Sequence, residues 1–158
     1  MMDNSRTYKT NRHSCYDLEY HLVVVTGYRH PVLVGDIETR LKEITKRLLT
    51  ENWGCELEAM ECDRDHIHVL FSAPPQICLA RLVDNYKTVT SRLLRKEFSE
   101  QLRPYYWKNA LWSKSYFIGG VNERTHDLVE QYIHDQKSKA RFRTVQKAKR
   151  NGNTVHGA

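Results

Sequence analysis

No apolar stretch of this chain is long enough to cross a membrane. The longest centres on residues 22–25, far short of the roughly 20 apolar residues that a membrane-spanning helix needs. The polar N-terminal region also lacks the apolar core of a secretory signal peptide. We therefore expect a cytoplasmic protein with no membrane partner.

Cysteine is scarce, and its spacing carries no metal signature. No two of the cysteines form a Cys-x-x-Cys pair; they stand at Cys15, Cys55, Cys62 and Cys78. In a cytoplasmic chain, scattered cysteines are most often reduced residues of the core or the surface. The pattern argues against a disulfide framework and against a zinc site built on thiolates. The chain also has no internal repeat.

The charge balance favours a polyanionic partner. The 158 residues include 25 Lys and Arg against 19 Asp and Glu, which gives a formal net charge of +6 at pH 7. With 40% apolar residues, this length suits a single domain with its own core. We expect that domain over residues 16–140, after a flexible leader (1–15) and before a basic, mobile tail (141–158).

Hydrophobic periodicity predicts the order β-α-β-β-α-β-α. Strands are expected over residues 17–26, 55–62, 65–73 and 115–121, and helices over 34–52, 77–98 and 125–139. In the second strand, alternation places Leu57 and Ala59 on the face opposite to Glu56 and Glu58. This order is typical of the α+β class: a ferredoxin-like antiparallel sheet with helices on one face, plus a C-terminal helix.

Four polar side chains stand out within this frame. His66 and His68 flank Ile67 on an expected strand, so both imidazoles point to one face while Ile67 faces the core. Tyr132 and Gln136 lie one turn apart on the last helix and can present a phenol and an amide oxygen to the same ion. Together they indicate a metal-assisted nuclease that uses a tyrosine as its nucleophile.

The ligand chemistry favours a particular class of ion. Two imidazoles and an amide oxygen are neutral, so the ion would keep its charge and open positions, which suits Mg²⁺ or Mn²⁺ better than a closed structural zinc site. Zinc stays an alternative. Either Asp65 or Asp63 could orient an imidazole from outside the ligand shell. The other histidines have no matching spacing and are expected to face solvent or to pack; they include His21, His30, His126 and His134.

Each element of this constellation also has an ordinary interpretation. A His-x-His pair can be a core or surface pair, and a helical Tyr with Gln one turn later can be amphipathic packing. The loop over residues 99–112 carries an aromatic cluster that either packs in the core or a dimer contact, or stacks bases. Its members are Tyr105, Tyr106, Trp107 and Trp112.

Basic residues suggest where nucleic acid would bind. Residues 137–150 contain many cations and no acid, which is typical of either a solvated tail or an arm on nucleic acid. The candidate DNA contacts are Arg29, Lys87, Arg92, Arg95, Lys114, Lys137, Lys139 and Arg141.

Read in order, these motifs resemble the single-tyrosine HUH transposases of the smallest bacterial insertion sequences, the IS200-like class. The matching blocks cover roughly residues 17–137 and are Asp-His-Ile-His-Val-Leu from residue 65, Tyr86-Lys87 through Ser91-Arg92 and Phe98, Leu-Trp-Ser-Lys-Ser-Tyr-Phe from residue 111, and Tyr-Ile-His-Asp-Gln from residue 132. Where the family often has Lys-Tyr-Arg after the first strand, this chain has Gly27-Tyr28-Arg29.

The resemblance implies a specific activity. Such proteins are homodimers that bind hairpin ends as single-stranded DNA and cut them with one tyrosine per site, leaving a 5′-phosphotyrosine and a 3′-hydroxyl. By position, His66, His68 and Gln136 would be metal ligands and Tyr132 the nucleophile, acting in its own subunit or in trans, with no small-molecule cofactor. The alternatives are a domesticated hairpin-binding protein, a related HUH endonuclease without transposition, and a metal-dependent hydrolase that uses water.

Overall fold

The computed structural model describes residues 9–10, 15–106, 108, 110–122 and 125–136. The expected tail, the candidate contacts Lys137, Lys139 and Arg141, and Trp107 lie outside these residues. Most of the expected leader does too, but Lys9–Thr10 (β1) pairs with Cys15–Tyr16 (β2). The ammonium of Lys9 also forms ion pairs with Glu56 and Glu58, which attach this ladder to the main sheet.

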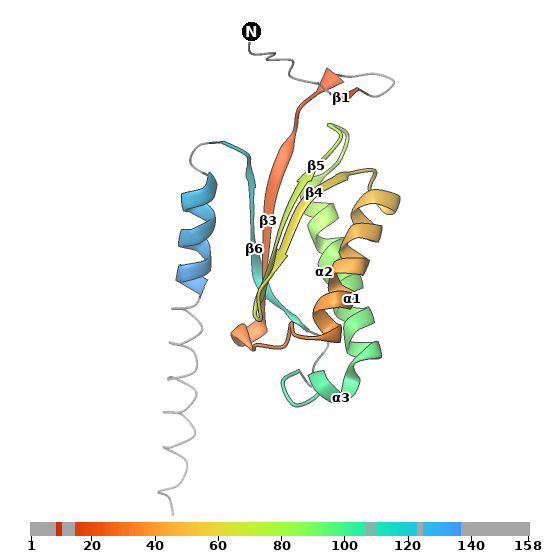
Figure 1. Cartoon of the computed structure of the whole chain (residues 1–158), viewed down its shortest axis with the longest axis vertical. Helices are drawn as coiled ribbons and strands as arrows, with labels where there is room; N and C mark the ends of the chain where they lie inside the picture. The colour runs from red at the N-terminus through yellow and green to blue at the C-terminus, as the bar shows by residue number, and fades with distance from the viewer. Residues whose placement is uncertain (1–8, 11–14, 107, 109, 123–124, 137–158) are drawn as a thin grey trace, which may run out of the picture.

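Four strands form one antiparallel sheet in the order β4-β5-β3-β6. They are β3 (Glu19–Thr26), β4 (Glu56–Cys62), β5 (His66–Ser72) and β6 (Trp112–Gly120). Figure 1 shows them as a twisted layer with helices on both sides. The two strands on either side of the first helix are separated by one strand in the sheet, which confirms the predicted ferredoxin-like arrangement.

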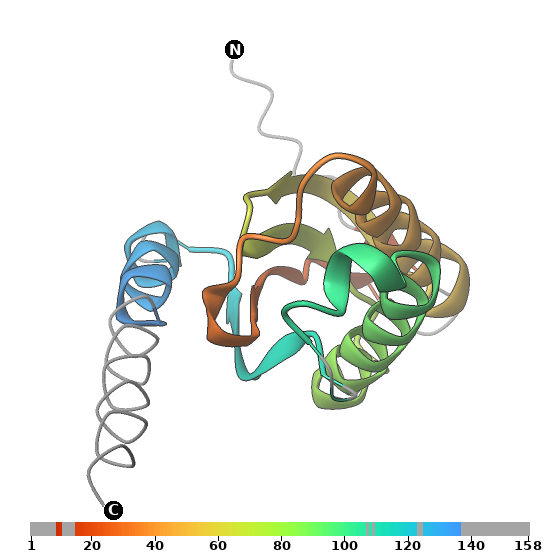
Figure 2. The ribbon, with the colours of Figure 1, turned by 90° about the horizontal axis from the view of Figure 1, so that it is seen from below.

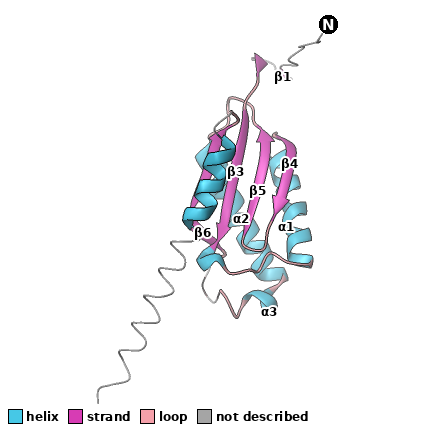
Figure 3. Cartoon of the chain, turned by 60° about the vertical axis from the view of Figure 1, so that its left-hand side comes forward, coloured by secondary structure: helices cyan, strands magenta, loops and turns pink. Residues whose placement is uncertain are grey.

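The helices divide between the two faces of the sheet. On one face lie α1 (Asp36–Arg47), which continues as the π-helical turn η2 (Leu48–Asn52), and α2 (Leu79–Glu97). A further helix over residues 125–136, hereafter the C-terminal helix, stands on the opposite face (Figures 2 and 3). Of the described helices, none is both long and apolar enough to span a membrane.

The second half of strand β3 is apolar at residues 22–25 because both of its faces are covered there. Leu22 and Val24 belong to the main core beneath α1 and α2. Val23 and Val25 belong to a second, smaller cluster with Val129 of the C-terminal helix. Alternate residues of a strand point to opposite faces, so a run of four apolar residues supplies two cores at once.

Three local predictions were wrong. A bulge between Leu57 and Ala59 shifts the register of β4, so Met60 packs against the main core and Ala59 is exposed. The expected loop after α2 begins with a short helix, α3 (Ser99–Leu102). Strand β6 begins at Trp112, three residues earlier than expected. The side chain of Trp112 is buried, and its backbone pairs with that of Thr26.

Candidate nuclease site

The sheet register places His66 and His68 on the face away from α1 and α2. The residues between and after them, Ile67 and Val69, are buried in the main core. His66 lies opposite Val25, and His68 lies opposite Val23. Both imidazoles therefore share the face that the C-terminal helix covers, as the alternation of the strand predicts.

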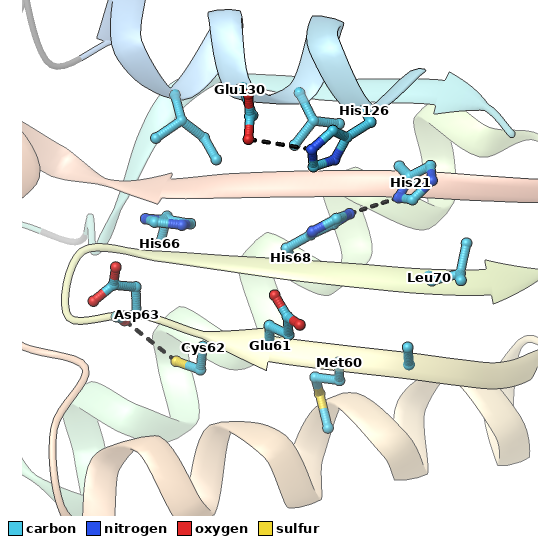
Figure 4. Close-up of a pocket in the computed structure, with 13 residues that line it drawn as sticks. His21, Met60, Glu61, Cys62, Asp63, His66, His68, Leu70, His126 and Glu130 are labelled. Atoms are coloured by element: carbon cyan, nitrogen blue, oxygen red, sulfur yellow. Dashed lines mark hydrogen bonds and ion pairs between the residues drawn. The ribbon is translucent and has the colours of Figure 1, made fainter. Parts of the chain in front are cut away.

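A pocket opens on this face between the sheet and the C-terminal helix (Figure 4). The sheet contributes both motif histidines, and the helix contributes Val129 and Ile133 to the apolar part of the lining. The remaining polar and charged lining residues are His21, Glu61, Asp63, His126 and Glu130. The motif histidines thus line a hollow with both acidic and basic neighbours.

A carboxylate fixes the orientation of His66. Its Nδ1 lies 2.8 Å from Asp65 Oδ1, and because an ionised carboxylate can only accept, the hydrogen is on Nδ1. Nε2 is then the acceptor of the ring, which is the form that binds metal ions. Asp65 thus occupies the orienting position that the sequence predicts for it or Asp63. Asp63 instead accepts a hydrogen bond from the backbone N–H of Arg64.

Two hydrogen-bond donors stabilise the ionised form of Asp65. Burial by itself raises the pKa of this carboxyl, but hydrogen bonds from His66 and Arg29 outweigh it, so the net pKa lies below the ordinary value. Arg29 donates from Nε to Asp65 Oδ2 at 2.9 Å. The carboxylate is therefore ionised at neutral pH and holds His66 in one tautomer.

His68 contacts another histidine. Its Nε2 lies 2.6 Å from Nδ1 of His21 on β3. Burial lowers the pKa of both rings. The charge of His126 lowers the pKa of His21 further, and the charge of His21 lowers that of His68, so neutral imidazoles are favoured. His21 packs against the ring of His68, which is one of the two expectations for it, but the hydrogen bond between the two rings was not predicted. His21 is diagonal to His68 across the ladder, and that pairing has no local sequence signal.

The C-terminal helix adds two further residues that sequence analysis left without a role. His126 Nε2 lies 3.2 Å from Glu130 Oε1, and both side chains line the pocket (Figure 4). By contrast, the expectation of packing holds for His30, whose ring contacts Tyr105 and Tyr106.

Tyr132 and Gln136 share one helix face, but the structure brings them to Ser115 rather than into the pocket. Tyr132 Oη lies 3.1 Å from Ser115 Oγ, and Gln136 Nε2 donates to the same oxygen at 3.1 Å. The phenol ring packs on Phe117 of β6. The pocket lining from this helix is formed instead by the residues at 126, 129, 130 and 133.

The surroundings of Tyr132 favour its neutral form. Burial raises the pKa of the phenol, and the hydrogen bond with Ser115 only partly offsets this. In this position burial, rather than the contact with Ser115, opposes ionisation of the phenol.

One chain supplies only some of the side chains that a divalent ion would need at this site. In the part of the chain that the structure describes, no three His, Cys, Asp or Glu side chains converge so that they could hold a metal ion. His66 and His68 are nevertheless two neutral imidazoles on one face, and His66 is oriented as metal-binding histidines usually are. They could fill two positions of a metal site, which would then need at least one donor beyond these two histidines.

The candidate DNA contacts differ in their surroundings. The side chain of Arg29 is only 10% exposed and is used internally, in place of the expected DNA contact. Lys87 donates to the backbone carbonyl of Lys114 and lies over the ring of Tyr116. Burial lowers the pKa of Lys87. Arg92 and Lys114 are exposed, as a contact to phosphate requires.

The aromatic cluster of the loop divides between core and surface. Trp112 is buried, and its indole N–H donates to Thr90 Oγ1 at 2.8 Å. Tyr106 donates to the backbone carbonyl of Gly27. Tyr105 is 44% exposed and contacts the ring of His30. Packing therefore accounts for the first two of these rings.

Comparison with known proteins places this arrangement in a family. The model of the family described as "Transposase IS200 like" matches residues 14–136. The chain is 37% identical over 131 residues to the ISDra2 transposase TnpA of Deinococcus radiodurans, covering 83% of this chain and 92% of that protein. It is 27% identical over 128 residues to the transposase of insertion sequence element IS200 of Salmonella typhimurium, covering 81% of this chain and 82% of that protein.

A solved structure agrees with these matches. A crystal structure of a candidate transposase from Deinococcus radiodurans R1 superimposes with a TM-score of 0.74 at 38% sequence identity. The match covers 81% of this chain and 97% of that chain. The residues that the family model matches include the sheet, both helices of the main core and the four predicted site residues.

Proposed function

This chain belongs to the IS200-like transposases, and we propose that it cleaves and rejoins single-stranded DNA at the ends of an insertion sequence. The observation that carries this proposal is the Asp65–His66 pair beside His68, under a helix that bears Tyr132 and Gln136. A protein that only binds DNA has no physical use for an oriented imidazole pair together with a phenol. The basic net charge of +6 suits the polyanionic substrate.

The chemistry follows from the phenol. Tyr132 Oη loses its proton and attacks the phosphorus of a phosphodiester, forming a bond to the 5′-phosphate. The bond to the 3′-oxygen breaks, and that oxygen takes up a proton and leaves as a 3′-hydroxyl. The phosphotyrosine retains the diester energy, so a 3′-hydroxyl from another strand can attack it and regenerate Tyr132. Strand transfer then needs no small-molecule cofactor.

We assign the metal-binding role to His66, His68 and Gln136. A divalent ion, Mg²⁺ or Mn²⁺, would act there as a Lewis acid on a non-bridging phosphate oxygen. Asp65 keeps His66 in the tautomer whose Nε2 accepts, while burial and the neighbouring histidines favour the unprotonated form of His68. Among the remaining donors, Gln136 is the one that shares a helix face with the nucleophile.

The reaction requires Tyr132 and Gln136 to leave Ser115. Two movements would achieve this: a shift of the helix on its own sheet, or insertion of the same helix from the partner in a homodimer. We favour the homodimer. In it, the helix of the partner can take the place of the chain's own helix, so that a Val129 side chain again covers Val23 and Val25. Hairpin ends of the element are the proposed DNA partner.

The alternative function is a domesticated protein that binds hairpin DNA, or a related endonuclease without transposition. The position of Tyr132 beside Ser115, with its pKa raised by burial, is the observation that favours a binding protein. The two functions differ in whether a covalent intermediate forms.

A single gel experiment tests the proposal. The protein is incubated with labelled single-stranded oligonucleotides from the flanks of its own gene, with Mg²⁺ or Mn²⁺, and examined by denaturing electrophoresis. We expect a protein–DNA adduct that is absent with chelator and in Tyr132→Phe. The matched control Tyr105→Phe, which removes the hydroxyl of an exposed tyrosine, should form the adduct normally.

The other outcomes point to the alternatives. Tight hairpin binding without an adduct would support the binding protein. Cleavage that survives Tyr132→Phe and leaves no adduct would support a hydrolase that uses water.

A further inference from the structure

We propose that Arg29 is a positioning residue that couples the docking of the C-terminal helix to the orientation of His66. Its Nε and Nη2 both lie 2.9 Å from Asp65 Oδ2. Its Nη1 donates to the backbone carbonyl of Ile133 at 2.8 Å. One guanidinium thus joins the carboxylate that holds His66 to the residue that follows Tyr132. The inference deepens the proposed function, on which the role of His66 rests.

The guanidinium is built into the protein rather than resting on its surface. The Arg29 side chain is 10% exposed, and that of Asp65 is 22% exposed. Both Tyr28 and Arg29 have positive φ angles, 57° and 51°. Side chains larger than glycine rarely adopt this conformation, and it persists only where the surroundings hold it. The inward position of Arg29 therefore goes with local backbone strain at Tyr28 and Arg29.

Hydrogen bonds to Asp65 and to Tyr106 hold the backbone around Arg29 in place. Thr26 donates its backbone N–H to the carbonyl of Asp65 at 2.9 Å. The hydroxyl of Thr26 reaches the carbonyls of His30 and Asp65. Tyr106 donates to the carbonyl of Gly27 at 2.8 Å. These bonds fix the turn after β3 to Asp65, directly before β5, and to the loop after α3, so Arg29 has little freedom to reach other partners.

The planar fork of arginine is needed for this double contact. Nε and Nη2 lie on one edge of the guanidinium and face the carboxylate, while Nη1 points to another side and reaches the helix. A lysine ammonium can pair with Asp65 but cannot span both partners in this geometry. When the helix leaves, Arg29 loses the carbonyl of Ile133, which helps to fix the position of the guanidinium that holds Asp65. The state of the helix is thereby transmitted to the residue that orients His66.

Two readouts that need no metal test the proposal in the full chain. The first is the tautomer of His66, taken from its ¹⁵N shifts. The second is amide hydrogen exchange over residues 125–136. In Arg29→Gln we expect exchange in the helix to rise about tenfold, because a charged hydrogen bond is lost. We also expect His66 to change from the Nδ1–H tautomer alone to a mixture. Arg40→Gln is the control, since it removes the same kind of side chain from an ion pair with Glu97 that is more exposed.

Two further variants separate the halves of the coupling. Arg29→Lys should keep the tautomer of His66 but show the faster helix exchange. Asp65→Asn should disturb the tautomer, and adding Arg29→Gln to it should change the tautomer no further. Mn²⁺ affinity, measured by calorimetry, should fall about 10- to 100-fold in Arg29→Gln and Asp65→Asn.

The proposal is overturned if Arg29→Gln leaves either the helix exchange or the tautomer of His66 as in the wild type. It is also overturned if Arg40→Gln has the same effects, since these would then report a general loss of stability. Failure of the wild type to bind Mn²⁺ counts against the metal role in the proposed function, while the two metal-free readouts still decide on Arg29.

Discussion

His21 Nδ1 lies 2.6 Å from His68 Nε2, so a hydrogen bond to a neighbouring histidine engages Nε2 of one motif histidine. The other, His66, is held through Nδ1 by Asp65. The two imidazoles are therefore prepared differently for a metal ion. His66 has Nε2 as its acceptor, whereas His68 must give up His21 before Nε2 can bind an ion.

We expect His21→Phe to tighten Mn²⁺ binding by about 2- to 10-fold. The reason is that one hydrogen bond, with a net worth of about 0.5–1.5 kcal/mol, no longer competes for His68. Isothermal titration calorimetry measures the change, with His134→Phe on the exposed side of the C-terminal helix as control. Weaker binding by His21→Phe would mean that His21 supports His68 rather than competing for it.

Val129→Ala should loosen the C-terminal helix more than the rest of the protein. Val129 is 4% exposed and packs with Val23 and Val25 in the smaller cluster. Loss of its two methyl groups should cost about 2 kcal/mol, mainly in the docking of this helix. Limited trypsin digestion should then release the helix faster, while urea unfolding of the sheet changes little. Leu128→Ala, at an exposed position of the same helix, is the control.

Leu94→Ala, in the main core, should instead lower the global free energy of unfolding by about 2–5 kcal/mol. Equal effects of Val129→Ala and Leu94→Ala on urea unfolding would show that the two clusters form one cooperative unit.

Thr90→Val should destabilise the fold by about 1–3 kcal/mol although it preserves shape. The buried indole N–H of Trp112 donates to Thr90 Oγ1 at 2.8 Å, and that hydroxyl donates to the carbonyl of Tyr86 at 2.7 Å. Valine would leave the indole without a partner, and an unpaired buried donor carries its full desolvation cost. Urea unfolding followed by tryptophan fluorescence measures this cost.

The control for that experiment is Thr88→Val, at an exposed position of the same helix. It should change the free energy of unfolding by no more than about 0.5 kcal/mol. A similar cost for both variants would point to helix propensity rather than to the hydrogen bond.

Alkaline conditions should destabilise the protein from about pH 9 upward. Burial raises the pKa of the Cys55 thiol from 9.0 to about 11 and contributes most to raising that of Cys62 to about 12. Above pH 9 the unfolded chain loses these protons while the folded chain keeps them. Stability is therefore complete below the unfolded pKa and falls as pH rises toward the folded pKa. The loss is about 1.4 kcal/mol per pH unit for the buried Cys55 thiol and less for Cys62, which is only partly buried.

Urea unfolding at pH 8, 9 and 10 measures this slope. Cys55→Ala should reduce the slope, while Cys78→Ala, which removes an exposed thiol, should leave it unchanged. An equal slope in the wild type and in Cys55→Ala would show that the Cys55 thiol does not ionise differently in the two states.

Much of the architecture follows from periodicity along the chain. The alternation around Ile67 predicts that His66 and His68 share a face, and the structure confirms it. The helical spacing of apolar residues predicts α1 and α2. The bulge after Leu57 and the early start of β6 were missed, because each depends on the fit of one strand to its neighbour. The strand propensity of a short segment does not depend on that fit and so cannot predict it.

The sequence by itself determined the order of the elements, the face of each histidine and the spacing of Tyr132 and Gln136. These properties follow from the fixed periods of strands and helices. Only the tertiary structure decided that His21 meets His68, that Tyr132 and Gln136 meet Ser115, and that Arg29 reaches the carbonyl of Ile133, 104 residues away. Such contacts depend on the register between distant strands and on where a helix docks. Both are set by burial summed over the whole molecule rather than by any local run of residues.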